Sequence, residues 1–506
     1  GLNFQNFIIP SLLLVIFLNF YLLNDIIKTR FLNLINFFPF LFLFNGSFNN
    51  LNLNFFVLLF SFIGINSILQ NKFNKKISLV YLLFSIIQIF AFTSKSIVFD
   101  IDKLKGFMNS SQTYPSLIFW IIIFYFFTVG VVFTINESLA HIDLAKIKFN
   151  FLITGALMVF LGIVSASNSF INFYSYYFLG LNKRGMTSLT STDGNTWRGL
   201  ASSAEAAGEY YAFTILLVVL LYFSKKIRVK NIEILFLIIN LVGLMRSNNF
   251  AATVSLFLFI FIYFFLKTNI RFKMKLIILF FGSIILSSIY IFSNYSYESA
   301  SKALLQNAYK ATEFYIDLPG DQFSYTAVDN LNFGEILSYP EEDTNISNSL
   351  YFLTKRYTYS QDIKYIPNSV AVISTISLPI NRSEKWGIFV AKYNPNFLSL
   401  SFGNGPQQIT EYYLGHRTKI NSGLVLPHSS FLDYLIFYGV FGLFTIITLV
   451  FLTVWKNKDN HLYVPLISFL ILNLLKSDSL LYSPSLILFI FIFNFYKIET
   501  EVSNPI

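Results

Sequence analysis

Two glutamates at helical spacing are the first residues in this chain that could do chemistry. Glu205 and Glu209 lie four positions apart in NTWRGLASSAEAAGEYY, where an apolar run begins, so they share one face of a helix. A carboxylate that enters an apolar helix is costly and normally faces a protein interior or a wet cavity. The pair therefore predicts either a proton-handling site or a structural pair with an interior Lys or Arg.

Two arginines at the borders of apolar runs predict an anion-binding site. Arg198 lies just before the run that carries the glutamates, and Arg246 lies in LMRSNNFAA, a connection of a few residues between two further runs. A guanidinium at such a tight turn can present a planar set of donors to phosphate oxygens. The alternative is that Arg246 is an interfacial side chain that only extends toward water.

His428 is the residue best suited to take a proton near neutral pH. It stands in LVLPHSSFLDYLIFYGVFG at the start of another apolar run, with Asp433 one and a half turns further on. A lone His in this position can equally serve as a cap or hydrogen-bond donor at a membrane interface. His416 and Arg417 lie upstream, where they could join the site or be solvated.

The sequence predicts neither a metal site nor a cofactor. Cysteine is absent, which excludes thiolate sites, and no His or Cys spacing typical of a metal centre occurs. A P-loop and a dinucleotide-binding glycine motif are also absent. The proposed chemistry therefore depends on carboxylates, arginines and histidine alone.

The elements that must position these residues are apolar helices. The chain has 506 residues, of which 55% are hydrophobic and 12% charged. Runs of about 20 apolar residues suit membrane-spanning helices, whereas a membrane β-barrel would alternate polar and apolar residues. We predict an all-α polytopic membrane protein with about 12–14 transmembrane helices. The candidate spans are 7–24, 31–45, 51–69, 77–93, 115–135, 149–168, 204–223, 229–245, 249–266, 274–293, 428–455, 460–475 and 480–497.

Loop charges predict which ends of these helices share a side. The loops after the odd-numbered spans carry about twice as many Lys and Arg as the short loops after the even-numbered spans. The positive-inside rule places the basic loops in the cytoplasm, with the N-terminus outside and the C-terminus inside. The same loops account for the net charge of +10, so we predict membrane lipids as partners and no nucleic acid.

Three regions follow from this pattern. Residues 1–293 hold about ten spans, residues 294–426 form one large loop on the outer side, and residues 427–506 hold about three spans. The loop is predicted to be partly helical, at 300–316, and is acidic over 317–348. A loop of this length is usually functional.

The order of these segments resembles the O-antigen polymerase and O-antigen ligase superfamily of bacterial membrane glycosyltransferases. The similarity covers about residues 150–455. It consists of Arg198 before a span rich in small residues, an Arg-Ser turn in a short hairpin, two spans, and a long outer loop that runs through Gly403-x-Gly405 into Pro-His-Ser. The hairpin of the family commonly reads Ser-Arg, whereas here Arg246 precedes Ser247.

The resemblance implies a metal-independent, inverting glycosyltransferase with a GT-C-like membrane fold in the bacterial inner membrane, its large loop periplasmic. The donor and the acceptor would both be undecaprenyl-pyrophosphate-linked oligosaccharides, and a chain-length regulator protein would be a further partner. Arg198, Arg246 and Arg417 would bind the pyrophosphate. His428, with Glu205 and Glu209, would provide the catalytic groups.

Three activities remain open from the sequence. The span count and the acidic outer loop favour an O-antigen polymerase in lipopolysaccharide biosynthesis. An O-antigen ligase, which transfers the glycan to lipid A–core, is the alternative, although a more basic outer surface would be expected for a phosphorylated acceptor. A lipid-linked oligosaccharide flippase is disfavoured, because such transporters usually have two similar halves and short loops.

Overall fold

The computed structural model describes most of the predicted spans and part of the segment between them. The described residues are 34–43, 55–69, 75–93, 114–167, 204–224, 230–267 without 248, the single positions 373, 377, 382, 386, 389 and 395, then 397–403, 405 and 427–497. Every element longer than a turn within this part is a helix, and it contains no β-strand. The predicted spans 7–24 and 274–293, most of the large loop, and the helix predicted at 300–316 lie outside the described residues.

Four described helices are long and apolar enough to cross a membrane. They are α6 (Tyr114–Ser138), α7 (Leu144–Ser167), α9 (Ala204–Phe223) and α20 (Ser430–Lys456). Shorter apolar helices are α3 (Phe55–Leu69), α4 (Lys75–Thr93), α10 (Asn231–Ser247), α11 (Phe250–Lys267), α21 (Tyr463–Leu474) and α22 (Ser483–Phe493). The chain is thus a multi-pass membrane protein by helix length and hydropathy.

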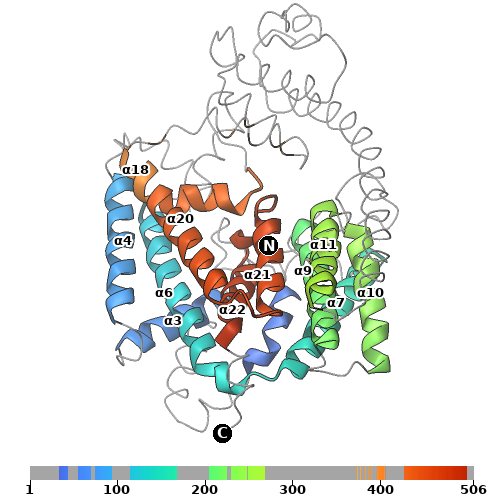
Figure 1. Cartoon of the computed structure of the whole chain (residues 1–506). Helices are drawn as coiled ribbons and strands as arrows, with labels where there is room; N and C mark the ends of the chain where they lie inside the picture. The colour runs from blue at the N-terminus through green and yellow to red at the C-terminus, as the bar shows by residue number, and fades with distance from the viewer. Residues whose placement is uncertain are drawn as a thin grey trace, which may run out of the picture.

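The helices pack in two groups with the C-terminal helices between them (Figure 1). In one group α3 packs on α6 and α4 lies beside α6, whereas in the other α9 packs on α10 and α11, with α7 against α10. Helix α21 contacts α9 and α11, and α22 contacts α6. The C-terminal helices therefore contact both groups and join them.

The second predicted span is a 3-10 helix, η2 (Leu34–Leu43), and not an α-helix. Pro39 lies at its centre, where it removes a backbone donor and opposes a regular α-helical turn. The side chain of Asn36 accepts a hydrogen bond from the backbone N–H of Asp143 at 2.8 Å and donates one to the carbonyl of His141 at 2.9 Å. These bonds attach η2 to the connection between α6 and α7.

Helix α20 is broken at Gly439, so the predicted span 428–455 consists of two helical parts. Gly439 has φ 65°, a left-handed conformation that suits glycine, and the two parts run in different directions (Figure 1). The broken turn leaves the carbonyl of Phe437 without an intrahelical partner. It accepts hydrogen bonds from the Gln88 side chain at 2.6 Å and from the Gly405 N–H at 3.0 Å.

The two ends of the bundle carry different polar residues. At one end, Asn36 contacts His141 and Lys148 contacts Glu233. At the other end, Asn249 contacts Glu205, and His428 faces both Glu205 and Asp478. Segments that the loop charges assign to one side meet at the same end in each case. Which end faces the cytoplasm stays a prediction.

Candidate functional site

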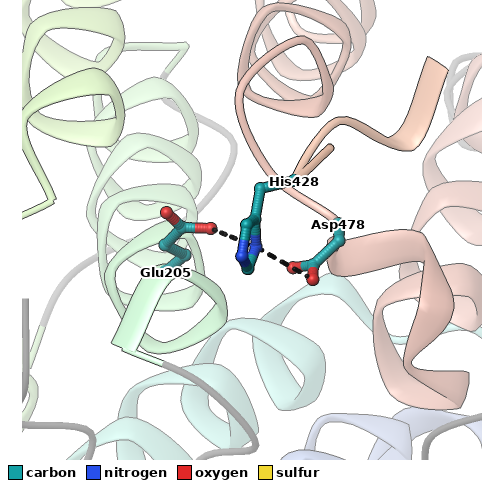
Figure 2. A group of neighbouring side chains, drawn as sticks. All are labelled: Glu205, His428 and Asp478. Carbon is teal, nitrogen blue, oxygen red and sulfur yellow. Dashed lines mark ion pairs between the residues drawn. The ribbon is translucent and has the colours of Figure 1, made fainter. Parts of the chain in front are cut away.

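The candidate site lies where three chain segments meet at one end of the bundle. Glu205 stands in the first turn of α9, His428 precedes α20, and Asp478 lies between α21 and α22. Figure 2 shows the imidazole of His428 between the two carboxylates. Three helix ends thus bring three titratable groups together, with Glu205 more than two hundred residues before the other two in the sequence.

The Nδ1 edge of His428 faces the carboxylates. Nδ1 lies 3.2 Å from Oδ2 of Asp478 and 3.9 Å from Oε2 of Glu205. Asp478 is almost fully buried, whereas 30% of the His428 side chain is exposed. Nδ1 itself is buried and makes no aligned hydrogen bond. The exposed surface of the side chain therefore belongs to its other atoms.

Arg382 closes the cluster from the segment before α18 (Phe397–Phe402). Its Nη2 forms an ion pair with Oε1 of Glu205, and its Nε donates to the carbonyls of Lys476 at 3.0 Å and of His428 at 3.4 Å. The side chain of Arg382 is buried. One guanidinium thus contacts all three segments that carry the carboxylates and the histidine.

The backbone that carries His428 is strained and held by side chains. His428 has φ 50°, an uncommon value for a residue with a Cβ, and such outliers persist only where surrounding contacts impose them. The carbonyl of Pro427 accepts a hydrogen bond from Nε1 of Trp386 at 3.1 Å. Together with Arg382 on the next carbonyl, Trp386 fixes the turn that points the imidazole at the carboxylates.

Ser430 ties the His428 segment to the Asp478 segment. Its backbone N–H and its hydroxyl both donate to the carbonyl of Ser477, at 2.7 and 2.8 Å, and its hydroxyl accepts from the N–H of Leu480 at 3.3 Å. Ser430 is two residues from His428, and Ser477 is next to Asp478. These bonds set the separation of the imidazole and the Asp478 carboxylate.

Two further carboxyl groups lie deeper, beneath the cluster. Glu209 is buried one helical turn beyond Glu205, within hydrogen-bonding reach of the Ser477 and Ser479 hydroxyls. Asp433 in α20 is fully buried, and neither of its side-chain oxygens has a hydrogen-bond partner. The site therefore holds more carboxyl groups than fixed cations.

Lys476 adds a titratable cation at the edge of the cluster, in the turn after α21. Burial and, next, the nearby Arg382 guanidinium lower the pKa of Lys476 to about 8, although Glu205 and Glu209 act in the opposite direction. Lys476 thus changes charge within a physiologically accessible range of pH.

The hairpin between α10 and α11 packs against the start of α9. The Asn249 side chain donates to the backbone carbonyl of Glu205 at 3.0 Å. A Cβ on Gly208 would lie 2.5 Å from the Cβ of Asn249 and 2.7 Å from the hydroxyl of Ser247. Glycine at position 208 therefore allows the hairpin to approach α9 next to the candidate site.

Glu205, His428 and Asp478 also have the donor atoms of a metal site. One atom from each lies within 4.8 Å of the others, and tetrahedral zinc with bonds of about 2.0–2.2 Å would need donors only slightly over 3 Å apart. However, Arg382 is paired with Glu205, and Lys476 is near enough to interact with the same carboxylate. Because Arg382 already pairs with one of the three donor residues, we favour proton transfer over metal binding as the use of this site.

The structure brings together only some of the residues predicted from the sequence. Glu205 and His428 are in contact, with Glu209 one turn deeper. Arg246 lies in the last turn of α10, but its side chain is outside the described part. Arg198 and Arg417 lie entirely outside the described residues. The predicted catalytic and pyrophosphate-binding roles therefore stay predictions.

Sequence reasoning missed two members of the cluster, Arg382 and Asp478. Asp478 stands in KSDS, a run of polar residues in a short connection between two apolar helices, which was a usable signal. Arg382 lies among other polar residues in the large loop, and its sequence context gives no comparable signal.

Comparisons with known proteins identify no relative of this chain. No protein-family model, no curated protein and no solved structure matches it. Any assignment of function therefore depends on the site and on the resemblance carried by the sequence motifs.

Proposed function

We propose that this protein is a membrane glycosyltransferase that acts on sugars linked to a polyprenyl diphosphate, as an O-antigen polymerase. The observation that supports it best is the position of a charged, buried cluster directly above an apolar pocket. A lipid-linked sugar has the same division, with a polar diphosphate and glycan attached to a hydrocarbon chain. The resemblance in segment order supports the same substrate class.

The apolar pocket has a volume of about 440 Å³ and lies between α20, α21, α22 and α6. Aromatic and aliphatic side chains form nearly all of its wall, including Phe431, Tyr434 and Phe489. Ser430 and Leu480 line it as well, and these two residues flank His428 and Asp478 in the sequence. The pocket suits a hydrocarbon chain whose head group reaches the charged cluster.

The proposed reaction needs a base and a means of stabilising the leaving group. As the acceptor hydroxyl attacks the anomeric carbon, the new C–O bond forms, the bond to the diphosphate oxygen breaks, and the hydroxyl proton passes to His428. Arg198, Arg246 and Arg417 would stabilise the negative charge on the departing diphosphate. Attack in line with the leaving group inverts the anomeric carbon.

Incubation of the purified protein with a lipid-linked repeat unit alone tests this proposal. A ladder of longer glycans without lipid A–core, nucleotide sugar or added metal supports a polymerase. Product formed only after lipid A–core is added would favour a ligase. Transfer of the intact lipid-linked glycan across vesicle membranes without a new glycosidic bond would identify a flippase instead.

The roles of the basic residues are tested by substitution. Arg198→Ala, Arg246→Ala and His428→Ala are each expected to abolish chain growth while the protein still inserts and purifies as a folded species. Lys458→Ala, in the connection between α20 and α21, is a matched control that should leave chain growth unchanged. Full-length polymer from all three site variants would contradict the assignment.

A further inference from the structure

We propose that Asp478 and Glu205 are positioning residues that keep a proton on Nδ1 of His428 and so leave Nε2 as the proton acceptor. The use of Nε2 in catalysis rests on the proposed function, but the protonation state of the ring does not. Neither Asp478 nor its contact with the histidine was predicted from the sequence. The proposal follows from the arrangement in Figure 2.

The distances determine which nitrogen carries the proton. Nδ1 of His428 faces two carboxylate oxygens, at 3.2 Å for Asp478 and 3.9 Å for Glu205. In a neutral imidazole one nitrogen carries hydrogen and the other a lone pair. A lone pair on Nδ1 would be repelled by both carboxylates, whereas an N–H would be attracted by both. Nδ1–H is therefore the favoured tautomer, and the lone pair lies on Nε2.

We infer that Nε2 is the nitrogen that a substrate can reach. Nδ1 is inaccessible to solvent, but almost a third of the His428 side chain is exposed, so the exposed atoms lie elsewhere on the residue. Nε2 is on the far edge of the ring from the carboxylates. A histidine that acts as a general base needs this arrangement. Carboxylates keep the proton on one nitrogen, and the lone pair of the other nitrogen accepts the proton of the substrate.

The neighbours of the two carboxylates keep them in place. Arg382 pairs with the second oxygen of Glu205, and its guanidinium also binds the carbonyl of His428. Ser430 holds the backbone on both sides of Asp478, since it donates to the carbonyl of Ser477 and accepts from the N–H of Leu480. Four segments in the described part bring titratable or charged groups to the region of His428. They are α9 with Glu205 and Glu209, the segment before α18 with Arg382, the connection between α21 and α22 with Lys476 and Asp478, and α20 with Asp433.

Nitrogen NMR of the full-length protein tests the tautomer without any assay of activity. The chain has four histidines, so ¹⁵N-histidine labelling in lipid nanodiscs gives few signals, and His428→Gln identifies the one from this site. At a pH where the ring is neutral, we expect Nδ1 to be protonated in the wild type. The double variant Glu205→Gln, Asp478→Asn should raise the share of the Nε2–H tautomer, whereas Asp459→Asn should not.

Three results would overturn the proposal. The first is an Nε2–H tautomer in the wild type. The second is an unchanged tautomer ratio in the double variant, provided that its elution volume and melting temperature show it to be folded. The third is a stoichiometric divalent metal that a chelator removes with a change in the His428 signals, because a metal ion would then occupy Nδ1.

Turnover of the lipid-linked repeat unit then separates this inference from the proposed function. Asp478→Asn should lower turnover by about 10²-fold or more, because His428 would accept the proton less well. The apparent KM should change little, because Asp478 does not bind the substrate in this proposal. A loss of turnover with an unchanged tautomer ratio would contradict positioning. An Nδ1–H wild type that transfers no sugar would refute the glycosyltransferase proposal and leave the tautomer assignment in place.

Discussion

The two ends of the helix bundle both bury charged groups, but in different ways. At one end Lys148 and Glu233 form an ion pair at 2.7 Å, and both side chains are almost fully buried. The same oxygen of Glu233, Oε2, also accepts a hydrogen bond from the backbone N–H of Lys230 at 2.8 Å, at the start of α10. The charge of each residue is matched by the other, and the pair joins α7 to α10.

The other end has an open cluster in which several groups share partners. His428 faces both Glu205 and Asp478, Glu205 is also bound by Arg382, and nearly a third of His428 remains exposed. A closed pair stabilises one arrangement of helices, whereas an open cluster with an accessible titratable group can accept or release a proton. The contrast favours the second end as the place for the proposed chemistry.

The largest expected effect separates the two ends by activity. His428→Gln should reduce glycan transfer by about 10²- to 10⁴-fold, because a base is lost, while the free energy of unfolding changes by less than about 1 kcal/mol. Turnover and thermal unfolding in detergent measure the two quantities. A variant that loses stability in proportion to activity would make His428 a structural residue.

The next largest effect belongs to the closed pair. Lys148→Met should lower the free energy of unfolding by about 3–5 kcal/mol, because Glu233 is left buried without its counter-charge. The double variant Lys148→Met, Glu233→Leu should recover most of that loss, since no charge remains uncompensated. Equal instability of the single and the double variant in detergent denaturation would argue against a closed pair.

A smaller effect is expected where the open cluster depends on a neutral hydrogen bond. Ser430→Ala should cost about 1 kcal/mol of stability and should lower turnover more than that loss explains, because the His428 and Asp478 segments separate. Ser61→Ala is the matched control, since its hydroxyl bonds only within and beside α3. Equal effects of the two substitutions on turnover would show that the link at Ser430 does not position the site.

The last expected effect is a dependence of stability on pH. The pKa of Lys476 is about 8 in the folded protein, below its ordinary value of 10.5. Between these two values the unfolded chain binds a proton that the folded protein has released, so stability rises with pH in this range. Unfolding of the wild type should become harder from about pH 8 to about pH 10 relative to Lys476→Met. An identical pH dependence in both proteins would contradict this.

The helices were largely predictable from the sequence, because apolar runs of about 20 residues leave few alternatives in a membrane. Helix α9 begins and ends at the predicted residues, 204 and 223. The errors have local causes: Pro39 changes the helix type in η2, and Gly439 interrupts α20. Hydropathy averages over a window and does not detect a single residue with unusual backbone angles.

The candidate site was only partly predictable. Glu205 and His428 were found because a charged or titratable residue at the start of an apolar run is unusual. Asp478 and Arg382 reach the site through tertiary contacts between segments distant in the sequence. The spacing of apolar residues does not predict which residue between α21 and α22 will face the histidine before α20. The contact between Asp478 and His428 could therefore be found only from the structure.

The break at Gly439 has a consequence for how this chain can vary in evolution. Before the break, residues of α20 such as Asp433, Tyr434 and Phe437 are buried beside the site, whereas after it Phe441, Phe444 and Phe451 are exposed on the helix surface. Substitutions in the first part change neighbours of the candidate site. Substitutions in the second part change the exposed surface or the wall of the apolar pocket, where apolar character is the main demand. We therefore expect the two parts of one helix to vary under different constraints, with Gly439 as the boundary between them.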